Sequence, residues 1–128
     1  MTANTERQRS SATGARHHLR DLREPTKRLR RQIPEVFKGF LDTSQATMTD
    51  GALSAKHKEL IALALAVSEH CEGCIAYHAR GAARRGATEP EVAEALSVTI
   101  LLGGGPAASD YAPRALEAFR EFASADAD

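Results

Sequence analysis

The fold is decided by residues 53–85, which read LSAKHKELIALALAVSEHCEGCIAYHARGAARR. Ser54 is a favourable N-cap residue for a helix. The apolar run at 60–67 leaves no polar face, so a helix over about 55–69 should be covered by protein on every side. Such a helix belongs in the core of an α-helical domain.

Further helices are predicted on both sides of this segment. A helix over 72–85 should end at Gly86, which is a common C-terminal cap. Thr88 and Glu91 form a capping box that starts the next helix. The buried stripe of that helix is expected to contain Val92, Leu96, Ile100 and Leu101. The glycines at 103–105 should end it, and a last helix carries Leu116, Phe119 and Phe122.

The N-terminal part of the chain differs in composition. Its first 38 residues contain ten basic and four acidic side chains, a net charge of +6, while the whole chain has a formal net charge of zero. Residues 1–33 are therefore expected to form a basic arm. We expect disorder over 1–16 because no aliphatic side chain larger than Ala follows Met1, and a weak helical stripe over 16–31 that Pro25 interrupts.

No alternating strand pattern occurs in the sequence, which predicts an all-α fold: a compact bundle of about five to six helices. The helical domain should span 34–123, beginning with a helix near Pro34, and an acidic tail should cover 124–128. The zero net charge gives no electrostatic reason to expect nucleic acid or a membrane as partner. No apolar run suits a signal peptide or a bilayer span, so a cytoplasmic location is expected.

Cys71, Cys74 and His78 are the side chains most able to carry chemistry. At about 100° per residue, all three lie within roughly 60° of one another on one helix face. Close cysteine pairs in a reducing compartment are more often redox-active or metal-binding than structural. With modest local adjustment, this pair can cycle between dithiol and disulfide.

Two further features support thiol chemistry. Cys71 lies at the predicted start of its helix, where free N–H groups and the helix dipole favour a thiolate. His78, one turn beyond Cys74, can accept a thiol proton and return it to a leaving group. Glu59 is a carboxylate in otherwise apolar sequence on the preceding helix. If that helix folds back onto the cysteine helix, Glu59 could orient His78.

The order Glu59, eleven intervening residues, Cys71-x-x-Cys74, three intervening residues, His78 resembles the core motif of the alkylhydroperoxidase D and carboxymuconolactone decarboxylase family. The similarity extends from about Pro34 to Phe122 and includes the segment GATEPEVAEAL at 86–96. The resemblance implies a thiol-dependent hydroperoxide reductase of the antioxidant, peroxiredoxin type. It also implies a homotrimer or homohexamer.

The resemblance assigns a role to each residue. Cys74 attacks the peroxide, Cys71 resolves the sulfenic acid to a disulfide, and Glu59 and His78 relay the proton. The partners implied are a hydroperoxide substrate and a thiol or dithiol reductant. No organic or metal cofactor is required, because the cysteines supply both electrons. Helix position, by contrast, favours Cys71 as the more acidic thiol.

The sequence departs from the family pattern at one position. The best-known peroxidases of the family have a histidine just before the second cysteine, where this chain has Gly73. His70 precedes the first cysteine and is a possible auxiliary residue. His70, like His57, His17 and His18, is nevertheless expected to be solvated rather than catalytic.

Other interpretations of the motif remain open. The two thiols could be inert core residues, or they could bind zinc together with His78 and either His70 or Glu59. The disulfide could instead switch an interaction of the basic arm, which would make the protein a redox sensor or binding module. A decarboxylase-like or lactone-processing enzyme would use Glu59 and His78 alone. Family members that act on a muconolactone generally lack the cysteine pair.

Overall fold

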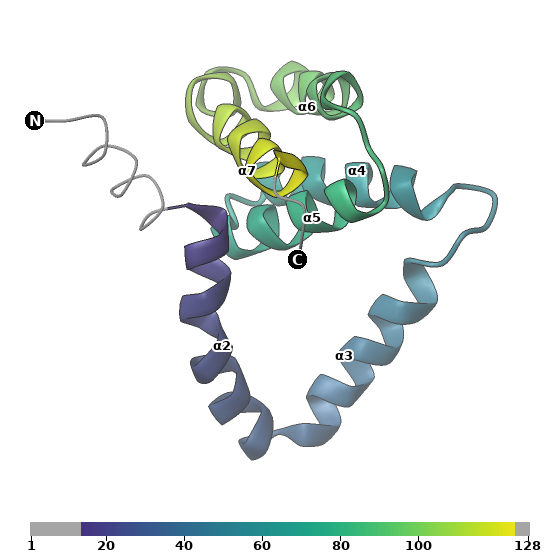
Figure 1. Ribbon diagram of the computed structural model, residues 1–128, viewed down its shortest axis with the longest axis vertical. Coiled ribbons are helices and arrows are strands. Elements are labelled where there is room, and N and C mark those ends of the chain that lie inside the picture. Colours follow the sequence, from purple (N-terminus) through teal and green to yellow (C-terminus); the bar gives the residue numbers. More distant parts are fainter. Residues whose placement is uncertain (1–13, 125–128) are drawn as a thin grey trace, which may run out of the picture.

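Every element of the computed structural model, which describes residues 14–124, is helical (Figure 1). The all-α prediction of five to six helices is confirmed. The α-helices are α2 (Ala15–Gln32), α3 (Pro34–Thr47), α4 (Ala55–Ser68), α5 (Glu72–Arg84), α6 (Glu89–Gly103) and α7 (Ala112–Ser124). A π-helical segment, η1 (Ala107–Tyr111), which the sequence analysis did not predict, leads into α7.

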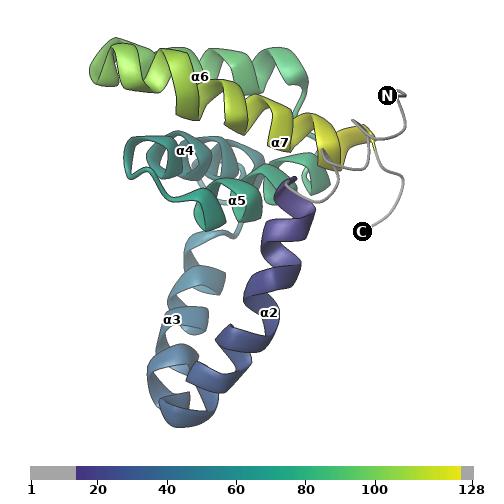
Figure 2. The ribbon, with the colours of Figure 1, turned by 90° about the vertical axis from the view of Figure 1, so that its left-hand side faces the viewer.

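Helices α4 to α7 form the bundle that holds the core (Figures 1 and 2). Helix α4 packs against α5 and α6, and α7 covers α5 and α6. Leu63, Val67 and Val92 are the largest fully buried side chains, and Phe119 and Phe122 of α7 complete the cluster. The expectation that α4 is covered all round is wrong for this single chain, because Ile61 and Leu65 are about half exposed.

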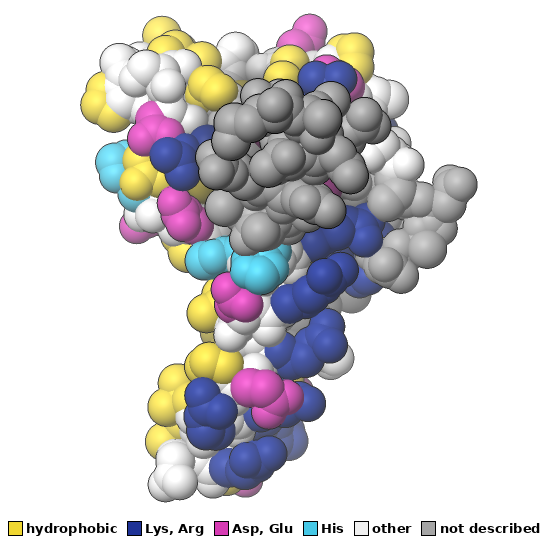
Figure 3. All heavy atoms as spheres, turned by 60° about the vertical axis from the view of Figure 1, so that its left-hand side comes forward, with side chains coloured by type: hydrophobic (Ala, Val, Ile, Leu, Met, Phe, Trp, Pro, Cys, Tyr) yellow, Lys and Arg dark blue, Asp and Glu magenta, His cyan; other side chains and the backbone are white. Residues whose placement is uncertain are grey.

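Helices α2 and α3 project from the bundle as a hairpin (Figure 2). Only the first turns of α2 lie near the bundle, and α3 packs against α2 alone among the described elements. The Glu121 carboxylate of α7 accepts hydrogen bonds from the N–H groups of Ala15 and Arg16, at 3.0 and 3.2 Å. These hydrogen bonds hold the first turn of α2 against α7. Lys and Arg side chains gather over the hairpin (Figure 3).

The predicted interruption at Pro25 is wrong, because α2 continues through this residue without a break. Proline removes one backbone donor from a helix interior. The residues around it are mainly Arg, Leu, Lys and Glu, which are strong helix formers, and the helix continues on both sides. The disorder expected over 1–16 is wrong for Ala15 and Arg16, which belong to α2 and whose N–H groups donate to Glu121. The tail expected over 124–128 starts one residue too early, because Ser124 is the last residue of α7. Residues 1–13 and 125–128 lie outside the described residues.

The capping box predicted for α6 is confirmed, and it also links α6 to α4. The Thr88 N–H donates to Glu91 Oε1 at 2.9 Å, and the Glu91 N–H donates to Thr88 Oγ1 at 3.3 Å. The same Glu91 carboxylate pairs with Lys56 of α4 at 2.8 Å. The hydrogen bond from Lys56, followed by that from the Thr88 backbone, lowers the pKa of Glu91 to about 2.

The buried stripe predicted for α6 is correct only in its first half. Val92 and Leu96 are buried, but Ile100 is partly exposed and Leu101 is 80% exposed. At 100° per residue Leu101 lies on the opposite side of the helix from Val92. The stripe continues through Thr99, whose hydroxyl lies 3.5 Å from the Ala64 carbonyl oxygen.

No helix within residues 14–124 is both long enough and apolar enough to cross a bilayer.

Leu63→Ala should lower the free energy of unfolding by about 2–5 kcal/mol, because it opens a cavity where α4 meets the rest of the core. Leu63 is 0% exposed, whereas Leu29 on α2 is 53% exposed. The matched Leu29→Ala change should therefore cost much less, within about 0.5 kcal/mol of the wild type. Equal losses for both variants in urea unfolding would contradict this packing.

Candidate redox site

A tight turn between α4 and α5 places the first cysteine. The His70 N–H donates to the Val67 carbonyl oxygen and the Cys71 N–H to that of Ala66, both at 3.1 Å. These two bonds form a Schellman motif, with His70 in the left-handed region at φ 55°. Gly86 occupies the same place after α5, at φ 80°. A histidine in a position that favours glycine thus reverses the chain just before the cysteine pair.

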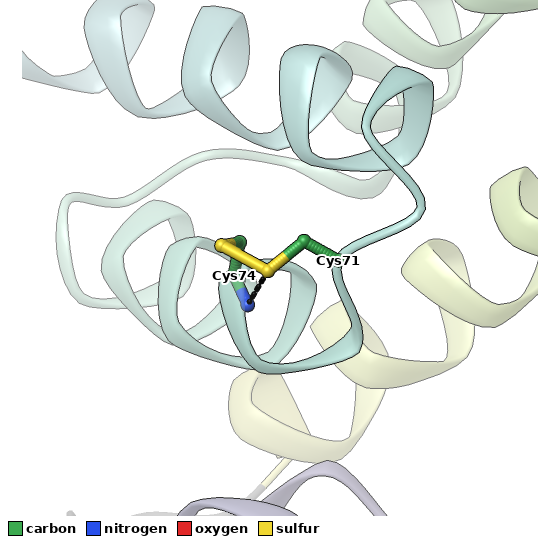
Figure 4. The surroundings of a disulfide bond; sticks show 2 residues. All are labelled: Cys71 and Cys74. Atoms are coloured by element: carbon green, nitrogen blue, oxygen red, sulfur yellow. Dashed lines mark hydrogen bonds between the residues drawn. A yellow bond between two sulfur atoms is a disulfide. The ribbon is translucent and has the colours of Figure 1, made fainter. Parts of the chain in front are cut away.

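Cys71 and Cys74 are joined by a disulfide at the start of α5 (Figure 4). Their Cα atoms lie 5.2 Å apart, a usual separation for a disulfide. Cys71 is the N-cap residue, and its Sγ accepts a hydrogen bond from the Cys74 N–H at 3.2 Å. Cys74 is exposed, whereas Cys71 is only partly exposed. The cysteine pair is therefore within reach of small molecules, with Cys74 the more open of the two.

Glu59 and His78 form a hydrogen-bonded pair between α4 and α5. Glu59 Oε2 lies 2.8 Å from His78 Nδ1. Glu59 is only 6% exposed, and a carboxylate this deeply buried requires a partner. His78 is partly buried and lies one turn after Cys74 on α5. The carboxylate fixes one ring nitrogen of His78 and leaves the other available for proton transfer.

Gly81 makes room for the Glu59 carboxylate. A Cβ atom at position 81 would lie 2.5 Å from Glu59 Cδ and Oε2, far inside a normal contact distance. The glycine stands in the interior of α5, one turn after His78, so both residues border the carboxylate. Gly81 was not among the site residues predicted from the sequence. Its signal was a glycine within a helical pattern, which often marks a close approach.

The predicted site residues do not all come together. Cys71, Cys74 and His78 belong to the start of α5, and α4 brings Glu59 to His78. His70 instead stacks on Tyr111, with ring centroids 4.3 Å apart and nearly parallel planes. His70 thus contacts the turn between α4 and α5 and Tyr111 of η1, and not Glu59 or His78.

Gly73, between the two cysteines, faces helix α2. A Cβ atom there would lie 3.3 Å from Leu22 Cδ1 and 3.6 Å from His18 Nε2. His18 is partly buried, not fully solvated as predicted. The position that carries a histidine in the family's peroxidases is therefore bordered in this chain by a histidine of another helix. Nothing in the sequence indicated this contact, because α2 and α5 are more than fifty residues apart at this point.

No cluster of three or more His, Cys, Asp or Glu side chains suited to a metal ion occurs in residues 14–124. The arrangement instead combines a thiol pair, which can give up two electrons, with an acid–base group held by a buried carboxylate.

The model of the carboxymuconolactone decarboxylase family matches residues 34–121 of the sequence. The chain belongs to this family. The match covers α3 to α7 for nearly their whole length, and thus every residue of the candidate site, whereas α2 lies outside it.

A solved family member is close in both sequence and structure. The apo crystal structure of a carboxymuconolactone decarboxylase family protein from Legionella pneumophila superposes with a TM-score of 0.81 at 42% identity. The match covers 85% of this chain and 96% of the Legionella chain. The Legionella protein thus has the same fold, and the match extends into the segment before residue 34.

Two relatives known from sequence are uncharacterized proteins. One, from Cupriavidus necator, is 43% identical over 86 residues, which cover 67% of this chain and 75% of the relative. Another, from Haemophilus influenzae, is 40% identical over 107 residues, which cover 84% of this chain and 94% of the relative. Neither name indicates a reaction, so the reaction is argued from the site.

Gly81→Ala should lower the free energy of unfolding by about 1–3 kcal/mol, because the new methyl group displaces a buried carboxylate from its partner. Gly39 of α3 provides the matched control, since no heavy atom lies within 4 Å of a Cβ added there. Gly39→Ala should stabilise the protein by about 0.5–1 kcal/mol. Denaturant unfolding of both variants checks this, and equal stabilities would mean that Gly81 does not confine Glu59.

Proposed function

We propose that this protein is a thiol-dependent hydroperoxide reductase that cycles Cys71 and Cys74 between dithiol and disulfide. The main support is one observation: the cysteine pair begins the same helix that carries His78, and His78 is held by the buried carboxylate of Glu59. The site therefore offers two electrons and a proton carrier side by side, and both are needed to cleave an O–O bond.

Cys74 is the attacking residue in this proposal. Its greater exposure gives a peroxide access, and it lies one helical turn from His78. His78 takes the proton of the Cys74 thiol, and the thiolate attacks the terminal oxygen of the hydroperoxide. An S–O bond forms and the O–O bond breaks, so that Cys74 becomes a sulfenic acid. The departing alkoxide takes the proton back from His78 and leaves as an alcohol.

Cys71 completes the oxidation. Its thiolate attacks the Cys74 sulfur, an S–S bond forms, and the S–O bond breaks to release hydroxide, which the Cys71 proton converts to water. The N-cap position of Cys71 supports this role, because backbone N–H groups there stabilise a thiolate. In total, two thiols are oxidised and one hydroperoxide is reduced to an alcohol and water.

Recycling requires an external thiol or dithiol, which reduces the disulfide by thiol–disulfide exchange. A reducing compartment such as the cytoplasm supplies such molecules. No organic or metal cofactor takes part in the proposed cycle.

The exposed apolar side chains support assembly into an oligomer, which we propose to be a homotrimer or homohexamer. Phe40 of α3, Leu65 of α4, and Leu101 and Leu102 of α6 are all more than half exposed in the single chain. Large apolar residues exposed on several helices are typical of surfaces that other subunits cover.

A redox switch is a second candidate function, favoured by the contact between α2 and the cysteine turn. Leu22 and His18 of α2 border Gly73. If reduction of the disulfide changed the shape of the turn, these contacts would shift the position of α2. This candidate predicts slow reaction with peroxide and binding of a partner that depends on the redox state of the pair.

The peroxidase proposal predicts different defects for the two cysteines. With dithiothreitol as reductant, Cys74→Ser should abolish peroxide turnover, because the attacking sulfur is lost. Reduced Cys71→Ser from which the dithiothreitol has been removed should still consume one equivalent of peroxide, leaving Cys74 one oxygen atom heavier by mass spectrometry. The oxidised wild type should be two hydrogen atoms lighter than the reduced protein.

Three outcomes would contradict this assignment in different ways. Unchanged turnover in Cys74→Ser would exclude Cys74 as the attacking residue. A disulfide that forms without turnover would favour the redox switch. Activity on a lactone that persists after both cysteines are replaced would favour acid–base catalysis by Glu59 and His78 alone.

A further inference from the structure

A second pocket lies along α5, beyond the cysteine pair. It has a volume of about 270 Å³ and is lined by Glu59, Tyr77, Arg80, Gly81, Arg84 and Arg85. Because Gly81 has no side chain and Glu59 is buried, the carboxylate forms the floor of the pocket. The three arginines and Tyr77 form its walls. The proposed reduction makes no use of these arginines.

The guanidinium groups of this pocket form no ion pair with another residue of the segment 14–124. In the part of the chain that the structure describes, no ion pair joins Arg80, Arg84 or Arg85 to a carboxylate. Burial lowers the pKa of Arg80, and the charges of Arg84 and Arg23 lower it further. Like charges one helical turn apart destabilise a helix. The arginines thus form a positive cluster that an anion would stabilise.

The helix dipole at the C-terminal end of α5 accounts for two of the three arginines in this cluster. A cation in the last turn interacts favourably with the helix dipole, which accounts for Arg84 and Arg85. Arg80 stands a turn earlier, is partly buried, and lies over the Tyr77 ring at 5.4 Å from its centroid. Its guanidinium is thereby held at the pocket, where planar N–H donors suit a carboxylate or phosphate.

The pocket borders the face of α5 that carries Cys74. At 100° per residue, Gly81 lies within about 20° of Cys74, and Arg84 and Arg80 lie about 80° and 120° around the helix from Cys74. The rise of seven positions from Cys74 to Gly81 spans roughly 10 Å of helix. The Glu59 carboxylate at the floor repels an anion, so the anionic group of a ligand would stay among the arginines. Its other end would then extend past Tyr77 toward Cys74.

On the basis of the proposed peroxidase function, we infer that the arginine pocket binds the oxyanion group of an anionic organic hydroperoxide and directs its peroxide end to Cys74. Because Arg80 and Arg84 rise about 9 and 15 Å above Cys74 along α5, the preferred substrates carry a carboxylate or phosphate roughly 9–15 Å from the peroxide. Hydrogen peroxide and small neutral hydroperoxides lack this anchor and react less efficiently.

The experiment compares linoleic acid hydroperoxide with its methyl ester, which differ in the negative charge. The wild type should show a higher kcat/KM for the acid than for the ester, below the concentration at which either forms micelles. In Arg80→Gln/Arg84→Gln the acid-to-ester ratio should fall tenfold or more, as the loss of one charged hydrogen bond of about 1.5–3 kcal/mol implies.

The matched control is Arg28→Gln/Arg31→Gln, which removes the same charge from the far half of α2. This variant should keep the wild-type ratio, because its arginines do not line the pocket. An equal ratio in the wild type and the pocket variant, or an equal fall in both double variants, would overturn the inference.

A direct binding measurement separates this inference from the peroxidase proposal. Octanoate and octyl phosphate are titrated calorimetrically into the oxidised wild type and into Arg80→Gln/Arg84→Gln. Binding of either anion to the wild type, weakened tenfold or more in the variant, supports the pocket even if no peroxide is turned over. Binding of neither anion overturns it, even if peroxides are reduced, and the anion that binds more tightly identifies the preferred oxyanion.

Discussion

The arrangement of the site depends on the hydrogen bond between the buried Glu59 carboxylate and His78. A carboxylate that is 6% exposed is costly to bury alone, and the imidazole at 2.8 Å compensates it. The same bond fixes the orientation of the His78 ring on α5. The contact that joins α4 to α5 thus also orients the imidazole that the proposed reaction uses as its proton carrier.

Two backbone features make this contact possible. The Schellman turn with His70 at positive φ reverses the chain within a few residues, so that α5 packs directly against α4. Gly81 then provides the space that the carboxylate occupies. Because Gly81 has no side chain, the Glu59 carboxylate also borders the arginine pocket. The proposed proton relay and the proposed anchor for an anionic substrate therefore both include this carboxylate.

The sequence predicted the elements of this arrangement better than their contacts. Helix boundaries depend on local signals, and the Thr88 capping box and the helix end near Gly86 were predicted correctly for that reason. Glu59 was identified as a carboxylate in apolar sequence, and the structure confirms its contact with His78. The catalytic roles of both residues remain predictions.

What the sequence could not predict depends on rotation and on distant packing. The error at Leu101 is of another kind, because helical spacing alone places Leu101 opposite Val92 and Thr99 within about 20° of it, and Thr99 is the buried residue. His18 lies beside Gly73 because α2 packs on α5, and no local pattern reports such a contact. The role of His70 in the turn follows from its positive φ, a backbone conformation that few residues other than glycine adopt and that no sequence pattern marked here.

The most direct test of the central claim is a double-mutant cycle on Glu59 and His78. The second-order rate constant for oxidation of the reduced protein by peroxide is measured in stopped flow for wild type, Glu59→Gln, His78→Asn and the double variant, each confirmed to be folded by circular dichroism. If the two residues act as one relay, the double variant reacts about as slowly as the slower single variant. Effects that multiply, as for independent residues, would contradict the account.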